Sequence, residues 1–489
     1  MDTKKPGASW LFTAFLASAI FLSGFNLAAG ELFFDFDNPA GNLSAALQSV
    51  DALDVPMAVP VLRPKSPDAD RPVDGRRLKE WTVMVFANGK NNLSSYFMRD
   101  LQAMEQSGSG DKINILMEVG LIREKGGLRG IKLSSPERKT KSGIIIPGRE
   151  LYAVVSVPEM PESVNWTGVK RFYVTRDKTA SSKISSLEVY ADPSADMADW
   201  KELADFITWG KLNFPAKKYM VVVSNHGLGW EGISADDITR NMMSVQELAK
   251  ALKETGKVDI YASNACLMQM AEVITELKDG ADIIIGSEDV EWGGWDFGPL
   301  MGFMSKNPGA GPEKVAKQAV DIFKKVSKKR GTSATLSAVR TSAIDGFIQR
   351  VNAWTDAVWQ SLLNEKDKDL FALESVTLGL KKARRYSKFE SFDLVDVVRG
   401  ISRFSASRQV TQTGNQLIKY IVRDLVVANA TEKIPGKGIA VFIPFRVYDM
   451  SYLALRWPRV TGWDKFSRFL GGIVEPQFRD KNKKTAGGD

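Results

Sequence analysis

The sequence is poor in two side chains that often carry nucleophilic and metal chemistry. It contains one cysteine, Cys266, and one histidine, His226, in 489 residues. A single cysteine cannot form an intramolecular disulfide, and zinc sites built from several cysteine and histidine ligands are excluded. We therefore expect no cofactor and no such metal site, while a calcium site built from carboxylates stays open. Any thiol or imidazole chemistry belongs to these two residues.

Other absences narrow the class further. The chain has no G-x-S-x-G motif, which disfavours a conventional serine hydrolase. It has no strong charge bias, since 66 Lys and Arg stand against 58 Asp and Glu, a formal charge of +8. With 44% apolar and 25% charged residues, the composition is typical of a globular protein and excludes wholesale disorder and fibrous architectures.

The N-terminus resembles a targeting segment. Lys4 and Lys5 precede an apolar stretch at 10–22, and small residues follow up to Gly30. This order predicts a signal peptide over 1–30 and an exported protein, periplasmic or secreted. The alternative is an uncleaved membrane anchor, because residues 10–29 are just long enough to span a bilayer. Only in that case do we expect contact with a membrane.

The rest of the chain divides by pattern. Residues 31–79 are proline-rich and predict a linker or prosegment. A catalytic domain is expected over 80–345, a C-terminal helical and strand region over 346–478, and a disordered tail over 479–489. In the first of these, apolar strands alternate with amphipathic helices, which predicts an α/β fold with a mostly parallel sheet covered on both faces. The predicted strands are 82–88, 113–120, 171–175, 219–227, 258–266, 281–288, 335–339 and 438–445.

The single histidine and the single cysteine end two successive predicted strands. His226 follows YMVVVSN, and Cys266 follows VDIYASNA. Because parallel strands end at one edge of the sheet, where α/β proteins gather reactive groups, both side chains are expected there. A helix predicted to start at Leu267 would place its positive end beside the sulfur and lower the pKa of the thiol. Gly227 and Gly229 leave backbone amides accessible for an oxyanion.

Each of these signals also has a structural interpretation. A lone cysteine is more often a small core residue, and a lone histidine is more often a satisfied structural one. Their shared placement makes the catalytic interpretation the better one. The match to G-x-G-x-x-G at 227–232 does not predict a dinucleotide site, because no periodic helix follows it.

Several blocks resemble the clostripain family of cysteine endopeptidases. They are WTVMVFANGKNNL (81–93), FPAKKYMVVVSNHGLGW (214–230), NACLMQMAEV (264–273) and SEDVEWGGWDF (287–297), with weaker blocks at 392–397 and 438–445. The resemblance implies a caspase-like three-layer sandwich. It makes Cys266 the nucleophile and His226 the general acid/base, with the amides of Gly227 and Cys266 as oxyanion donors. It implies no obligatory third member.

One position departs from the family pattern. Asn264 stands two residues before the cysteine, where family members carry an aspartate that helps select Arg or Lys at the cleaved bond. A neutral amide cannot offer a guanidinium the same charge-assisted bond. The resemblance places the substrate pocket at Asn264, Ser287, Glu288, Asp289, Glu291 and Trp295, and Asp289 or Glu291 could replace the missing charge. Self-cleavage between the two catalytic blocks would fall at Arg240–Asn241, although a surface arginine in a turn explains Arg240 somewhat better, given Asn264.

The sequence therefore predicts an exported cysteine endopeptidase that acts on protein or peptide substrates. The alternative is a catalytically weak pseudo-peptidase that binds peptides, which Asn264 motivates. A third interpretation is binding of anionic polymers by the basic insertion at 121–150. That insertion lacks the interleaved aromatics of a nucleic-acid site, so we expect a solvated loop and no nucleic-acid partner.

Overall fold

The computed structural model describes residues 78–473, with gaps at 124–126, 135–137, 140–144, 147–149, 162–163, 180–182, 364–368, 387–389 and 445–447. The predicted signal peptide, almost all of the predicted linker or prosegment and the predicted tail lie outside these residues. Within them, no helix is both long and apolar enough to cross a bilayer.

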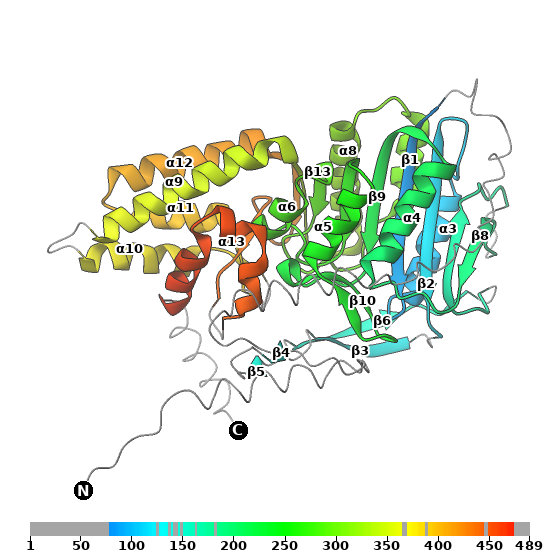
Figure 1. Ribbon diagram of the computed structural model, residues 1–489, viewed down its shortest axis with the longest axis horizontal. Helices are drawn as coiled ribbons and strands as arrows, with labels where there is room; N and C mark the ends of the chain where they lie inside the picture. Colours follow the sequence, from blue (N-terminus) through cyan, green and yellow to red (C-terminus); the bar gives the residue numbers. More distant parts are fainter. Residues whose placement is uncertain are drawn as a thin grey trace, which may run out of the picture. The chain divides into compact units, whose positions relative to one another are not determined.

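A nine-stranded sheet forms the centre of the described chain (Figure 1). Its five middle strands are parallel and lie in the order β13 (Ala281–Gly286), β12 (Val258–Asn264), β9 (Ala216–Ser224), β1 (Lys79–Gly89) and β2 (Ile113–Leu121). Antiparallel strands complete both sides: β14 (Ala334–Arg340) and β17 (Val426–Glu432) beyond β13, and β7 (Gly168–Tyr173) and β8 (Leu187–Asp192) beyond β2.

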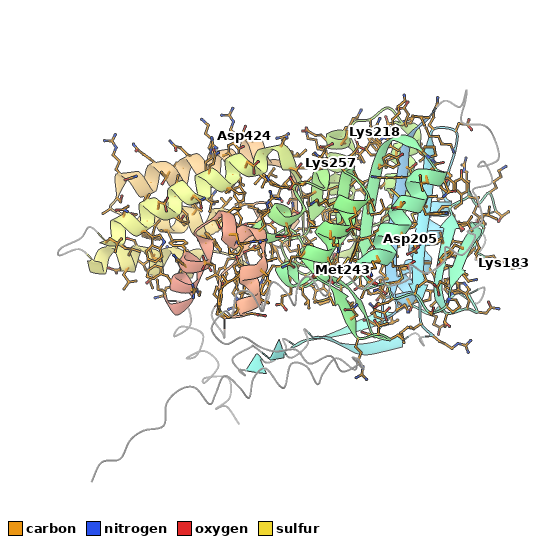
Figure 2. All side chains as sticks on the ribbon, in the orientation of Figure 1. Lys183, Asp205, Lys218, Met243, Lys257 and Asp424 are labelled. Carbon is orange, nitrogen blue, oxygen red and sulfur yellow. The ribbon has the colours of Figure 1, made fainter. Side chains whose placement is uncertain are left out.

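The middle strands are apolar on both faces because helices cover both. Alternate residues of β1 enter two separate cores, Met84 and Phe86 one and Val83 and Val85 the other. The first core includes side chains of α4 (Trp200–Asn213), α5 (Val245–Glu254) and α6 (Ala271–Leu277). The second includes side chains of α3 (Ser94–Glu105), α7 (Phe297–Lys306) and α8 (Pro312–Arg330). Side chains fill the space on both faces of the sheet (Figure 2), and the predicted three-layer fold is confirmed.

The start of α5 carries a local sequence signal, whereas the helix after Cys266 does not begin where its sequence predicts. Ser244 and Glu247 form a capping box at the start of α5. The helix predicted to start at Leu267 is wrong, because α6 begins only at Ala271. Leu267 has a φ of +64°, and its amide donates to the Asp289 carbonyl (3.1 Å) rather than within a helix. Hydrogen bonds to a distant loop therefore replace the first helical turn.

The C-terminal region is continuous with the sheet. β17 pairs with β14, so the sheet crosses the boundary that we predicted at residue 345. The buried carboxylate of Glu272 on α6 accepts from the Phe442 amide (3.0 Å) and the Tyr452 hydroxyl (2.7 Å), both C-terminal. At the predicted boundary lie η2 (Thr341–Ala343) and α9 (Ile344–Leu363). The helices beyond it are α10 (Asp369–Lys382), α11 (Leu394–Phe404), α12 (Arg408–Tyr420), a π-helical turn (Ile421–Leu425), η4 (Met450–Ala454), α13 (Arg456–Val460) and a helix at 463–473. A small sheet there consists of β15 (Arg385–Tyr386), β16 (Ser391–Asp393) and β18 (Ala440–Phe442).

The basic insertion contains two pairs of antiparallel strands. They are β3 (Gly127–Ser134) with β6 (Glu150–Val157), and β4 (Arg138–Lys139) with β5 (Ile145–Ile146). The segment predicted as a loop is thus partly a β-ribbon, which its scattered charges and glycines did not indicate.

Candidate active site

His226 and Cys266 line one cavity of about 400 Å³ at the carboxyl ends of β9 and β12. The two strands are parallel neighbours, and Ser224 lies opposite Asn264 at the last paired position. Each reactive residue follows its strand by two positions, so the register of the sheet brings both to the same level. The sequence pattern and the sheet topology therefore agree on this edge.

The turns that carry the two residues pack directly on each other. A Cβ atom added to Gly227 would overlap the carbonyl oxygen of Cys266, so only glycine allows this approach. The amides of Leu228 and Ser234 on either side donate to Gly232 (3.0 Å) and His226 (3.2 Å). In the part of the chain that the structure describes, no hydrogen bond engages the Gly227 amide, which suits an oxyanion donor.

Asn92 orients the imidazole of His226. Its side-chain oxygen lies 2.8 Å from His226 Nε2. Because an amide oxygen only accepts, Nε2 carries the proton and Nδ1 remains as the base. Burial lowers the pKa of His226 to about 4, so the imidazole is neutral at pH 7. The sequence analysis did not single out Asn92; the polar run GKNN directly after a buried strand was the available signal.

A polar network holds the loop that carries Asn92. Asn88 and Asn91 donate to the Ala235 carbonyl at 3.1 and 2.8 Å, and Asn225 accepts from the Ala235 amide at 2.8 Å. Ala235 belongs to β10 (Ile233–Asp236), which forms a hairpin with β11 (Asn241–Met243). The hairpin between the two catalytic candidates thus supports the residue that orients the imidazole.

Burial holds Cys266 as a neutral thiol. Its side chain is 8% exposed, and burial raises the pKa of the thiol to about 12. The Glu291 amide donates to Sγ (3.3 Å) and lowers the pKa, whereas the carboxylates of Glu291 and Asp289 raise it. Our expectation of a lowered pKa was wrong, because α6 begins five residues after the sulfur and its positive end does not reach it.

The cavity separates the predicted pocket residues into two groups. Asn264, Glu291 and Trp295 line it. Ser287, Glu288 and Asp289 do not; they are buried behind the wall, where the Ser287 hydroxyl lies 2.9 Å from the Thr335 hydroxyl. Thr335 also accepts from the amides of Glu288 and Asp289 (3.1 Å each) and turns these residues away from the cavity.

Three charged residues that the sequence analysis missed also line the cavity. Arg99 and Asp100 come from α3, and Arg330 comes from the end of α8. Arg330 donates to the carbonyls of Gly293 (2.5 Å) and Gly294 (2.9 Å). Burial raises the pKa of Asp100 to about 8, although the Arg330 charge opposes this.

The Glu291 carboxyl is the unusual group in this wall. Burial raises its pKa well above the ordinary value, although the Ala265 amide and the Arg330 charge favour its ionised form. Both oxygens are buried, and within the described residues neither has a donor in hydrogen-bonding geometry. A buried carboxyl without a partner costs about 1–3 kcal/mol, so a group that binds it is favoured.

A model of the clostripain family matches residues 85–465. The chain belongs to the clostripain family. It is 26% identical over 232 residues to a clostripain of Hathewaya histolytica, a match that spans 43% of this chain and 39% of that relative.

Solved structures with the same fold support the assignment. A secreted C11 cysteine protease of Bacteroides thetaiotaomicron, in complex with an irreversible peptide inhibitor, is similar with a TM-score of 0.55 at 16% identity. An inactive zymogen C11 protease of Parabacteroides distasonis is similar with a TM-score of 0.52 at 18% identity. Each match covers 79% of this chain and 99% of the other.

Asn264 has a structural role in this member of the clostripain family. Its Nδ2 donates to the Ser224 hydroxyl (3.1 Å), and its Oδ1 accepts from the Trp295 amide (3.1 Å). The Asn264 side chain therefore links the end of β9 to the loop at 290–295, which lines the cavity. A carboxylate could accept the second bond but could not donate the first.

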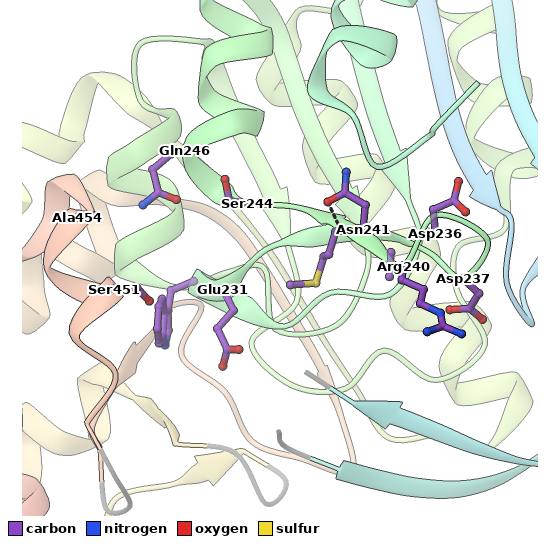
Figure 3. A pocket seen from close by; sticks show the side chains of 12 residues that line it. Glu231, Asp236, Asp237, Arg240, Asn241, Ser244, Gln246, Ser451 and Ala454 are labelled. Carbon is purple, nitrogen blue, oxygen red and sulfur yellow. Dashed lines mark hydrogen bonds between the residues drawn. The ribbon is translucent and has the colours of Figure 1, made fainter. Parts of the chain in front are cut away.

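Arg240 lies in a different cavity, of about 890 Å³, which shares no lining residue with the first. It occupies the tip of the β10–β11 hairpin beside Asp237, with Ser451 and Ala454 lining the same cavity (Figure 3). Arg240 is exposed and has a φ of +58°. Its exposed position in a turn fits both interpretations that the sequence left open.

Proposed function

We propose that this clostripain-family chain is an exported cysteine endopeptidase that uses Cys266 and His226. The observation that carries the proposal is the convergence of both side chains on one cavity, with a backbone amide on the sulfur. Sγ attacks the peptide carbonyl, and the thiol proton passes to Nδ1 of His226. The imidazolium then protonates the leaving amine. Water hydrolyses the thioester, and the dyad returns to its neutral form.

Both resting groups favour the neutral form, with pKa values of about 12 for Cys266 and about 4 for His226. A preformed thiolate–imidazolium pair is therefore disfavoured in the empty cavity. Proton transfer then accompanies the attack rather than preceding it, and His226 acts as a general base. Asn92 supports this role because it keeps the proton on Nε2.

Glu291 can replace the negative charge that Asn264 lacks, because a basic substrate side chain beside its buried carboxyl favours the ionised form, and this supports cleavage after basic residues. Its unpartnered carboxyl lines the same cavity as Cys266. A guanidinium or ammonium group of the substrate would give it a charge-assisted bond. Aromatic side chains in the cavity wall, Tyr96, Phe97, Trp292 and Trp295, can cover the aliphatic part of such a residue.

A positional-scanning peptide library tests activity and selectivity together. Wild type should cleave after Arg or Lys, and Cys266→Ala should lose turnover. Glu291→Gln should reduce the preference for basic over neutral residues about tenfold or more. Asp296→Asn is the matched control, because Asp296 adjoins the same loop without lining the cavity and should leave the preference unchanged.

Three outcomes contradict these proposals. Turnover that survives in Cys266→Ala removes the nucleophile assignment. An unchanged preference for basic residues in Glu291→Gln would contradict the proposed role of Glu291 in substrate selection. Absence of turnover on every peptide, while iodoacetamide still labels Cys266, favours the pseudo-peptidase instead.

Self-cleavage at Arg240–Asn241 would act on the hairpin that supports Asn92. The exposed arginine supports this proposal, and the neighbour described as a zymogen is consistent with it. Mass spectrometry of purified wild type and Cys266→Ala decides. A cut at 240–241 in wild type alone supports processing, and an intact chain in active enzyme removes it.

Export is supported by the N-terminal pattern and by the similar protease described as secreted. N-terminal sequencing of the protein outside the cytoplasm tests it. A mature chain that starts after Gly30 is expected, whereas a retained residue 1 in the membrane fraction indicates the anchor.

A further inference from the structure

Two buried carboxyl groups meet behind the wall of the active-site cavity. Glu288 follows β13, and Asp393 ends β16 in the C-terminal region. The hydroxyl of Tyr386 lies 2.9 Å from Glu288 Oε1 and 2.8 Å from Asp393 Oδ2. The Gly438 amide donates to Glu288 (3.0 Å), and the Lys437 amide donates to Asp393 (2.7 Å). All three residues are fully buried.

The geometry requires an extra proton. One hydroxyl has one hydrogen, so Tyr386 can donate fully to only one carboxyl. Two ionised carboxylates this close, in a fully buried site, would repel each other strongly. The Tyr386 hydroxyl therefore donates one of its two short hydrogen bonds. In the other, a protonated carboxyl donates to the tyrosine oxygen.

The extra proton belongs on Glu288. The second oxygen of Asp393 accepts from the Asp396 amide (2.8 Å) and caps α11, which favours its ionised form. The second oxygen of Glu288 has no hydrogen-bond partner among the described residues, and Gly436 packs closely over it. Burial raises the pKa of Glu288 well above its ordinary value, and the Asp393 charge adds to this.

The segment that Glu288 anchors runs beside the cysteine turn. We call residues 287–291 the anchoring loop. Its Ser287 carbonyl accepts from the Gln269 amide (2.9 Å), and its Asp289 carbonyl accepts from the Leu267 amide (3.1 Å). At its end, the Glu291 amide reaches Cys266 Sγ at 3.3 Å. The position of the sulfur therefore depends on where this loop is held.

We propose that Glu288 is a positioning residue: as a protonated acid bridged by Tyr386 to Asp393, it holds the anchoring loop against the Cys266 turn, and its ionisation releases the loop. The inference rests on the proposed role of Cys266. It makes the C-terminal region part of the active-site machinery, because Tyr386 and Asp393 both come from that region.

Few other charges act on this group. Burial raises the pKa of Asp393 to about 6, and the charge of Asp396 on α11 adds to this; Asp396 also pairs with Arg399 (3.1 Å) on the exposed side of the helix. From β14, Thr335 contributes only a hydroxyl. From the segment before β18, Lys437 contributes its amide. The pH at which the loop is released is therefore governed by Glu288 and Asp393.

The sign of the pH dependence follows. The pKa of Glu288 is higher in the folded protein than in the unfolded chain, so the folded state holds the proton more tightly. The bridge is fully formed at low pH and is lost as pH rises through the folded pKa. Above that point, turnover should fall because the sulfur is misplaced, while labelling of Cys266 by iodoacetamide should rise because the buried thiol becomes accessible.

The test compares wild type with Glu288→Gln and Tyr386→Phe. Each is assayed for peptide turnover and for iodoacetamide labelling of Cys266 between pH 6 and pH 10. Glu288→Gln keeps an uncharged group in place and should remove the alkaline fall in turnover. Tyr386→Phe breaks the bridge at every pH and should lower turnover about tenfold to hundredfold at pH 7 while labelling rises.

Tyr420→Phe is the control. It also removes a tyrosine hydroxyl bond to the rest of the chain, at the Ala343 carbonyl (3.1 Å), but far from any carboxyl pair. It should leave both pH profiles unchanged. Thermal melting and near-UV circular dichroism of each variant separate a released loop from an unfolded protein.

The outcomes are distinguishable from those of the proposed function. If wild type cleaves no peptide but its labelling profile shifts in Glu288→Gln, the proposed function fails and the positioning role stands. If Glu288→Gln and folded Tyr386→Phe keep the wild-type profiles for both turnover and labelling, the positioning role is wrong.

Discussion

At the scale of single residues, the site is held by neutral groups. His226 and Cys266 are both uncharged, because burial lowers the pKa of His226 to about 4 and raises the pKa of Cys266 to about 12. An amide, Asn92, orients the ring where a carboxylate could have done so. A neutral orienting group keeps the imidazole unprotonated over a wide pH range, which suits a base.

Asn92→Asp tests this arrangement. A carboxylate 2.8 Å from Nε2 would favour the imidazolium and raise the pKa of His226 from about 4. The acid limb of the kcat/KM profile should move to higher pH by about one unit or more. Asn213→Asp, at a side chain that bonds the Trp209 carbonyl within α4, is the control and should not move it. An unmoved acid limb in Asn92→Asp would show that this contact does not govern the base.

At the scale of elements, the turn after β12 determines the site. A helix from Leu267 would have favoured the thiolate. Instead, a turn at Leu267 leads into an irregular segment up to Met270, and this segment bonds the anchoring loop and β18. The seven-residue α6 starts afterwards. Activation of the thiol therefore depends on contacts between loops and on the neighbouring His226 turn.

Gly227→Ala tests the contact between the two turns. The added methyl group would overlap the Cys266 carbonyl, so the His226 turn must move away. We expect a loss of kcat of about a hundredfold in a folded protein, because small misplacements have effects of that size. Gly462→Ala, where no atom lies within 4 Å of the new methyl group, should match wild type. Near-normal kcat in Gly227→Ala would show that the turns can separate without loss.

At the scale of the whole described chain, the C-terminal region completes the fold. It adds the edge strand β17 to the sheet and provides the donors for Glu272 and Glu288. Without it, both carboxyl groups would lose their partners, and the edge of β14 would be uncovered.

Truncation after residue 345 tests this dependence. A chain of residues 78–345 should aggregate or lack a cooperative thermal transition, whereas residues 78–473 should melt cooperatively. Circular dichroism and size-exclusion chromatography of both chains provide the measurement. A stable, monomeric 78–345 chain would mean that the predicted boundary marks an independent domain after all.

Much of the fold could be read from the sequence because its signals are local. Strands such as β1, β2 and β9 are apolar on both faces and are recognisable in the sequence as short, continuous hydrophobic segments. β17, VVANATE, was not predicted, since an edge strand of small and polar residues has no such run. The α6 start was missed because LMQMAEVITEL has the right composition for a helix.

The sequence by itself determined the sheet class, the family and the two residues that the site is built on, because each is encoded by types and spacings along the chain. Tertiary structure alone decided that Asn92 contacts the imidazole, that the Glu291 carboxyl is buried in the cavity wall and that Tyr386 bridges Glu288 and Asp393. These features depend on distances between residues as far as 134 positions apart and on exclusion of water, and local sequence patterns encode neither quantity.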